Sequence, residues 1–237
     1  DLHSFPTRRS SDLLMTGAKT QRYYLSELQD WEKAVGINQM EASDPADIAA
    51  FMEAAEKDDS DSVKRFLESG MSVATRDKDG WTAFMRASFK CSVHTMQLLL
   101  DSSADVNAKN NDGTTAIMIA AFYNDADIMP LLIRAGADVN ARENDGSTAL
   151  ITAAMKNALS AARLLINAGA DLNAQDEDGW TALIYAVNNC SEDMVRLLVD
   201  SGANVNIRAK DGSNALNTAQ DYQTKPIIRL LRNAGAR

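Results

Sequence analysis

One stretch, Asp145-Gly146-Ser147-Thr148-Ala149-Leu150, decides the fold, because its Asp-Gly pair returns every 33 residues without insertion or deletion. The five pairs are Asp79-Gly80, Asp112-Gly113, Asp145-Gly146, Asp178-Gly179 and Asp211-Gly212. A second column with the same spacing holds Gly70, Ser103, Gly136, Gly169, Gly202 and Gly235. A fixed period between about 20 and 50 residues is typical of a solenoid, in which short units stack on their neighbours.

Ten of the twelve glycines lie in these two columns, so they mark a repeated turn and not low complexity. The 237-residue chain carries 24 Lys and Arg against 33 Asp and Glu, a net charge of −9, and 45% of its residues are hydrophobic. This acidic balance argues against nucleic acid or an anionic membrane as the main partner. No apolar run reaches about 18 residues, so we expect no transmembrane helix. The two cysteines are too few for a disulfide framework or a zinc site.

Each unit is predicted to form a turn, a short first helix, a tight turn and a second helix. Around the quoted stretch, Thr148 precedes an apolar face made by Ala149 and Ala153, which is the pattern of a helix start. Gly169 follows the second helix and ends it, because glycine adopts the left-handed conformation without a steric penalty. Extending the register backwards predicts a degenerate first unit that begins near Pro45.

These columns resemble those of ankyrin-repeat proteins. The family pattern, roughly D-x-x-G-x-T-P-L-H-x-A-A with a later L-L-x-x-G-A-D-V-N-A, is matched by the quoted stretch, by Leu164-Leu165 and by Ala168-Gly169-Ala170-Asp171-Leu172-Asn173-Ala174. The resemblance covers about residues 45–237. It implies an all-α solenoid of helix-turn-helix units with β-turn or hairpin fingers, in which five repeats follow a degenerate capping repeat. The expected repeats span about 45–76, 77–109, 110–142, 143–175, 176–208 and 209–237.

Four columns depart from the family pattern, and in the first of them the family proline is Ala throughout. The family histidine is replaced by Met85, Met118, Ile151, Ile184 and Asn217, so we expect apolar packing where the family has hydrogen bonds. The glycine between the two helices is replaced by Cys91, Asn124, Asn157, Cys190 and Gln223, of which asparagine tolerates positive φ best. Ser103 stands in the helix-ending glycine column, where a left-handed residue with a side chain costs about 1 kcal/mol. We therefore expect a weak junction there.

The two ends differ from the repeats. Residues 1–13 resemble a translated sequencing adapter, which would lie outside the fold and would mean that the native N-terminus is missing; a genuine Ser/Arg-rich tail is the alternative. Residues 14–44 are expected to form a separate N-terminal helical segment, with a helix from about Tyr23 to Val35. This helix either shields the first repeat or remains from an upstream domain. The last repeat carries polar residues that suit a solvent-facing end, namely Asn214, Asn217 and Gln220.

The chain shows little sign of catalytic chemistry, and we expect no enzyme, cofactor or metal site. Cys91 and His94 have the spacing of a thiolate–imidazole pair, but no third group orients them, so a turn residue and an ordinary helix side chain are favoured. Cys91 and Cys190 lie three repeats apart, roughly 30 Å for helices packed ~10 Å apart, which excludes a disulfide. The Asp-Gly aspartates are expected to accept hydrogen bonds from their own turns.

The resemblance implies a concave binding groove lined by finger tips and by the ends of the first helices. Carried onto this chain, the expected partner-binding residues are Arg76, Lys78, Trp81, Phe89, Lys90, Lys109, Asn111, Phe122, Tyr123, Arg142, Asn144, Met155, Lys156, Gln175, Trp180 and Arg208. An apolar stripe on the N-terminal half of the groove is predicted from Trp81, Phe89, Phe122, Tyr123 and Met155, since aromatic side chains are frequent interface hot spots. The alternative is that these rings only pack against neighbouring turns and helices. Arg76, Lys109, Arg142 and Arg208 form a basic row that suits an acidic peptide, unless it only balances nearby aspartates.

Two functions follow from this reading. The first is a non-enzymatic module that binds another protein, or an acidic peptide segment, through the concave face. The second is the C-terminal regulatory array of a larger enzyme or signalling protein whose catalytic domain lay upstream. We expect a soluble monomer that binds neither nucleic acid nor a membrane. The sequence favours the cytoplasm without deciding the compartment.

Overall fold

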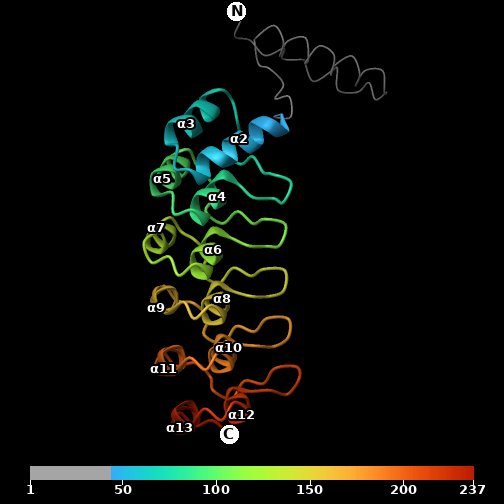
Figure 1. Ribbon diagram of the computed structural model, residues 1–237, viewed down its shortest axis with the longest axis vertical. Coiled ribbons are helices and arrows are strands. Elements are labelled where there is room, and N and C mark those ends of the chain that lie inside the picture. The colour runs from blue at the N-terminus through green and yellow to red at the C-terminus, as the bar shows by residue number, and fades with distance from the viewer. Residues whose placement is uncertain (1–43) are drawn as a thin grey trace, which may run out of the picture. The chain divides into compact units, whose positions relative to one another are not determined.

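The computed structural model describes residues 44–237, and within this range twelve helices form six stacked pairs (Figure 1). The first helices of the pairs are α2 (Pro45–Glu56), α4 (Ala83–Phe89), α6 (Ala116–Phe122), α8 (Ala149–Met155), α10 (Ala182–Asn188) and α12 (Ala215–Asp221). The second helices are α3 (Ser60–Glu68), α5 (Val93–Asp101), α7 (Met129–Arg134), α9 (Leu159–Asn167), α11 (Glu192–Asp200) and α13 (Lys225–Asn233). The predicted all-α solenoid is confirmed. The predicted helix at residues 23–35 and the adapter-like residues 1–13 lie outside the described residues.

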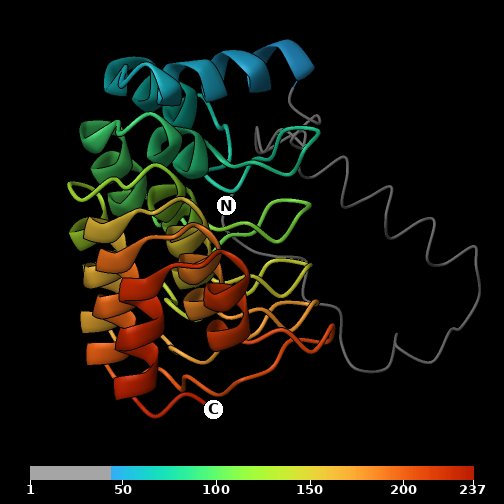
Figure 2. The same ribbon diagram turned by 60° about the horizontal axis from the view of Figure 1, so that its bottom comes forward.

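The loops that carry the Asp-Gly pairs, here called fingers, project from one side of the stack (Figure 2). In the described part of the chain, the fingers contain isolated β-bridges, such as the one between Arg76 and Thr82, but no β-strand. Backbone hydrogen bonds join successive fingers. The amide of Asn111 donates to the carbonyl of Asp79 at 3.1 Å, and the amide of Glu177 donates to the carbonyl of Asp145 at 2.7 Å. The fingers therefore form one continuous surface.

Local residues explain where the helices start and stop. The hydroxyls of Thr82, Thr148 and Thr181 accept the backbone N–H three residues later, which satisfies an unpaired donor at each helix start. The tight turns between paired helices need positive φ, and the replacement residues adopt it, with φ from 53° to 57° at Cys91, Asn124, Asn157, Cys190 and Gln223. Ser103 has φ of 67°, so it takes the left-handed conformation of the glycines in its column.

The core contains the apolar replacements of the family histidine. Met85, Met118, Ile151 and Ile184 are each at most 1% exposed, which confirms apolar packing in four repeats. The fifth repeat differs: Asn217 accepts the backbone N–H of Asn214 at 2.6 Å and donates its own N–H back at 2.9 Å. The expectation of apolar packing is therefore wrong in that repeat. Asn214 is also buried, and not solvent-facing, because it is the N-cap of α12.

The paired leucines of the second helices differ in burial. The second leucine of every pair is fully buried, and the first is only half-buried. The buried members are Leu99, Leu132, Leu165, Leu198 and Leu231. Each of these second helices thus packs into the core through the second leucine of its pair, together with other buried residues such as Met96 in α5 and Met194 in α11.

The Asp-Gly aspartates behave differently from the prediction in three fingers. Asp145 and Asp211 do accept local backbone N–H groups, from Ser147 and Ser213, both at 2.8 Å. In the other fingers this expectation is wrong, because the side chain two positions earlier caps the turn. The capping residues there are Asp77, Asn110 and Asp176. Glu143, the equivalent residue in the finger of Asp145, is left without this role.

Candidate functional site

A hollow of about 400 Å³ lies between the fingers and the ends of the first helices. It is called the groove pocket below and is lined by Trp81, Phe89, Thr114, Met118, Ile119, Phe122, Tyr123, Glu143, Asp145, Ser147, Thr152, Met155 and Lys156. Six of these were predicted from the sequence as partner-binding residues: Trp81, Phe89, Phe122, Tyr123, Met155 and Lys156. The structure therefore brings the predicted apolar stripe together at one place.

The rings of the groove pocket form a continuous chain across two repeats. Trp81 and Phe89 meet edge to face at 6.1 Å between centroids, and Phe89 meets Tyr123 in the same way at 5.3 Å. Tyr123 then lies 4.9 Å from Phe122. These separations and angles are those that aromatic pairs prefer, so the rings hold one another in place.

Part of this chain of rings remains accessible. Phe122 is 42% exposed, Tyr123 54% and Met155 42%, whereas Trp81 and Phe89 are half-buried. Cationic side chains lie over three of the rings. The Lys156 ammonium is 4.1 Å from the Phe122 centroid, Lys90 is 4.6 Å from that of Phe89, and the Arg86 guanidinium is 4.7 Å from that of Trp81. The groove pocket is thus an aromatic surface with one basic side chain, Lys156, in its lining.

The basic row is held by hydrogen bonds between fingers. The side chains of Arg76, Lys109 and Arg142 each donate to the backbone carbonyl of the residue 33 positions later. Gln175 makes the same contact with the carbonyl of Arg208 at 3.1 Å. Because these donors already have acceptors in the next repeat, the row stabilises the spacing of the fingers.

Comparison with known proteins gives the same architecture. A family model described as ankyrin repeats, in three copies, matches residues 51–143, 92–176, 117–209 and 171–237. The chain belongs to the ankyrin-repeat family. It is similar to the crystal structure of an ankyrin repeat domain from Acinetobacter baumannii AYE, with 34% identity, a TM-score of 0.73, and coverage of 79% of this chain and 98% of that one. No curated protein matches the chain.

The remaining predicted residues of the ankyrin-repeat domain lie outside the groove pocket. The side-chain amides of Asn111 and Asn144 donate to backbone carbonyls in the preceding finger, at 3.2 and 2.9 Å. Lys78 is exposed near the capping repeat, where it lines a separate hollow of about 540 Å³. Trp180 lines another hollow, of about 580 Å³, together with Tyr185 and Asp178. The predicted residues therefore do not form one contiguous site.

Glu143 is a pocket residue that sequence reasoning missed. Its half-buried carboxylate accepts a hydrogen bond from the hydroxyl of Thr114 at 2.6 Å. Burial raises the pKa of Glu143, and the charges of Asp145 and Asp112 raise it further, while the Thr114 hydrogen bond opposes them. A signal was present in the sequence, since this column reads Asp77, Asn110, Glu143, Asp176 and Ala209, with a single longer acid.

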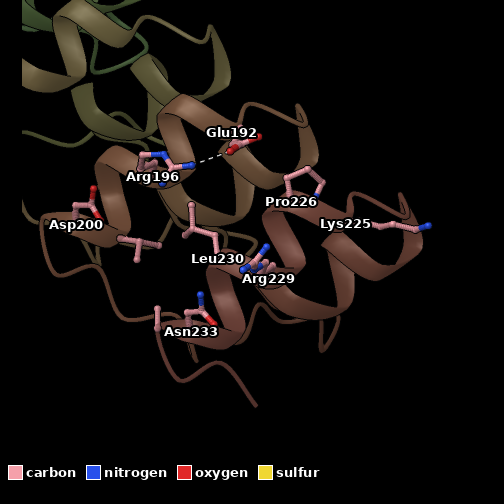
Figure 3. Close-up of a pocket in the computed structure, with 10 residues that line it drawn as sticks. Glu192, Arg196, Asp200, Lys225, Pro226, Arg229, Leu230 and Asn233 are labelled. Carbon is pink, nitrogen blue, oxygen red and sulfur yellow. Dashed lines mark hydrogen bonds and ion pairs between the residues drawn. The ribbon is translucent and has the colours of Figure 1, made fainter.

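A further hollow of about 790 Å³ lies on the second helices α11 and α13, away from the predicted residues (Figure 3). Its wall includes the ion pair between Glu192 and Arg196, at 2.7 Å, and the side chains of Lys225 and Arg229. Open charged surfaces of this kind contribute little binding free energy on their own, because water competes for each charge.

The cysteine and histidine side chains do not form a catalytic pair. The Cys91 thiol donates to the carboxylate of Asp125, and His94 Nδ1 lies 2.9 Å from Asp58 Oδ2. Burial raises the pKa of Cys91 to about 11, and Asp125 adds to this effect. Cys91 and Cys190 are both free thiols. Within residues 44–237, no group of three or more His, Cys, Asp and Glu side chains is arranged to hold a metal ion. No helix in this range is long and apolar enough to cross a membrane.

Proposed function

We propose that this ankyrin-repeat domain binds another protein through its concave face, with the groove pocket at the centre of the contact. The observation that carries the proposal is the accessible, contiguous apolar surface of Phe122, Tyr123 and Met155 around a hollow. Scattered exposed apolar residues are ordinary, but a cluster of rings beside a cavity is typical of an interface centre. Ankyrin-repeat domains are, in general, protein-interaction modules.

The other predicted residues are assigned supporting parts in this proposal. Asn111, Asn144, Lys78 and Trp180 supply a polar and aromatic rim along the fingers. Lys90 and Lys156 stay close to the rings that they cover. Gln175 and the basic row act indirectly, because their side chains already bond the next finger or their own finger. An acidic peptide on the basic row and a monomeric state stay predictions.

The test compares two variants of the described domain within the full chain. A partner is first captured from a lysate of the source organism, identified by mass spectrometry and purified, and its Kd is then measured by titration. Replacing both Phe122 and Tyr123 by Ala is expected to weaken binding at least about 30-fold, since truncated hot spots cost 2 kcal/mol or more.

The matched control is Val93→Ala, because Val93 is also 42% exposed but lies on α5, outside the groove pocket. It should leave Kd unchanged. Circular dichroism should show equal helix content in all three proteins. If the double variant binds as tightly as the parent protein, the groove pocket is not the interface.

A further inference from the structure

In the first full repeat, three side chains pack together beside the finger. Arg86 lies over Trp81 and also pairs with Asp77, with 2.5 Å between Arg86 Nη2 and Asp77 Oδ2. An acid, a tryptophan and a guanidinium thus occupy three fixed positions of the repeat. Together these three side chains are called the plug below.

The repeat that spans residues 176–208 has a plug at the same three positions. Trp180 lies 4.9 Å from Tyr185, whose hydroxyl donates to Asp176 Oδ2 at 2.7 Å. Here a tyrosine hydroxyl takes the place of the guanidinium. In both repeats, a side chain from the first helix therefore satisfies the acid of the finger and packs on the tryptophan.

The two repeats between them lack the plug, and the groove pocket lies beside them. Their tryptophan position holds Thr114 and Ser147, and their Arg or Tyr position holds Ile119 and Thr152. All four residues line the hollow. The acid, however, is retained at Glu143. The acid of the plug is thus present at Glu143. The tryptophan, and the arginine or tyrosine that would bond the acid, are absent from these two repeats.

The charges around Glu143 leave it without a cation. The negative charges of Asp145 and Asp112 act on the Glu143 carboxylate, and the Thr114 hydroxyl donates a hydrogen bond to it. Lys156 lines the same pocket, but it lies over Phe122 and forms no ion pair with Glu143 among the described residues. A half-buried carboxylate without a cation is costly, so a cation supplied from outside would be favoured at this place.

We propose that the groove pocket receives an arginine side chain of the bound protein, whose guanidinium pairs with Glu143 and packs among the Phe122 and Tyr123 rings. This inference rests on the proposed function and names the chemistry of the partner. Arginine fits better than lysine, because a planar guanidinium can bond a carboxylate through two N–H groups and stack on a ring at the same time. The chain uses that same combination at Arg86.

The experiment uses two small probes of nearly the same shape, of which one is charged and the other is not. N-acetyl-arginine methylamide and its uncharged citrulline counterpart are titrated into the full chain, and binding is followed by NMR at Thr114, Phe122 and Tyr123. The arginine probe is expected to bind about tenfold more tightly, the gain typical of a hydrogen bond to a charged group. It should also lower the pKa of Glu143, read from its side-chain carboxyl carbon, which an uncharged binder would not do.

Two variants connect this preference to Glu143. Glu143→Gln keeps an oxygen for the Thr114 hydroxyl but removes the charge, and it should bind both probes equally. Glu177→Gln makes the same change on an exposed finger residue outside the pocket, and the tenfold preference should remain. Equal affinity for the two probes in the parent protein, no binding of either probe, or a preference that survives Glu143→Gln would each overturn the inference.

A third variant rebuilds the plug from within. Thr152→Arg places a guanidinium at the position of Arg86, so it should pair with Glu143 and abolish binding of the arginine probe. If the probe binds this variant unchanged, the arginine does not occupy the proposed place. The inference and the proposed function fail separately. The double variant of Phe122 and Tyr123 could lose partner binding while the parent protein shows no preference for the arginine probe. That result would support the groove pocket as the interface and overturn only the arginine assignment.

Discussion

The Arg142 guanidinium lies 2.7 Å from the backbone carbonyl oxygen of Gln175, 33 residues further along the chain. The same nitrogen also donates to the carbonyl of Gly146 in its own finger, at 2.9 Å. Lys109, one repeat earlier, makes the equivalent contact with the carbonyl of Arg142, at 2.8 Å. One side chain per repeat thus holds two successive fingers at a fixed spacing.

Arg142→Ala is expected to lower the free energy of unfolding by about 1–2 kcal/mol, because two carbonyls lose a charged donor. Thermal unfolding followed by circular dichroism measures the effect. Arg142→Lys should recover much of the loss, since lysine already makes this contact at position 109. Arg163→Ala, on the exposed surface of α9, is the control and should change stability little. A loss of stability as large at Arg163 as at Arg142 would contradict the finger-spacing role.

Ser103→Gly is expected to raise the melting temperature. Ser103 has φ of 67°, where a residue with a side chain is strained by about 1 kcal/mol and glycine is not. Differential scanning calorimetry on the parent and the variant measures the shift. Ser102→Gly should lower the melting temperature instead, because Ser102 has φ of −88° and its hydroxyl donates to the carbonyl of Leu98. A drop for Ser103→Gly would show that its side chain has a stabilising contact that outweighs the strain.

Leu165→Ala should destabilise the domain more than Leu164→Ala. Leu165 is fully buried in α9, and Leu164 is only half-buried in the same turn. Truncating a buried leucine costs about 2–5 kcal/mol, in proportion to the cavity that it leaves, and a half-buried leucine costs less. Urea unfolding curves of both variants give the two values. Equal losses would mean that the repeats collapse around either cavity to the same extent.

Glu143→Gln should stabilise the domain at neutral pH and have no such effect in acid. Burial and the neighbouring aspartates raise the pKa of Glu143, so the folded protein holds the proton more tightly than the unfolded chain. Its contribution to stability therefore falls as the pH rises above its ordinary value of 4.5. Melting temperatures at pH 3 and pH 7 test this, with Glu177→Gln as the control. A variant that melts below the parent protein at pH 7 would show that the carboxylate is stabilising.

The repeat register, the helix starts and the left-handed turns could be predicted from the sequence, because each depends on a few residues close together in the chain. Thr148 as an N-cap and the positive φ of Ser103 are examples. The apolar stripe could be predicted from the repeat period as well, because the period places Tyr123 one repeat after Phe89, and the two rings are in contact. These features follow from local geometry repeated at a known interval.

The features that were missed depend on which groups of two neighbouring repeats come within reach. The column of Arg76, Lys109 and Arg142 was expected to face a partner, but a column of cations does not reveal the backbone carbonyl that lies beside each one. Glu143 was overlooked because its setting depends on Thr114, in the previous repeat, and on small residues elsewhere. The single longer acid in that column was the one local sign.

The uninterrupted 33-residue register also has a mechanical consequence. An extended chain spans at most about 3.6 Å per residue, so each repeat that leaves the stack lengthens the molecule by roughly 11 nm. Every release adds nearly the same length, because no repeat carries an insertion. Under tension along the stack the domain would extend in equal increments from one end. A ligand in the groove pocket contacts repeats 77–109, 110–142 and 143–175, so it would stay bound while the capping repeat and the last two repeats yield.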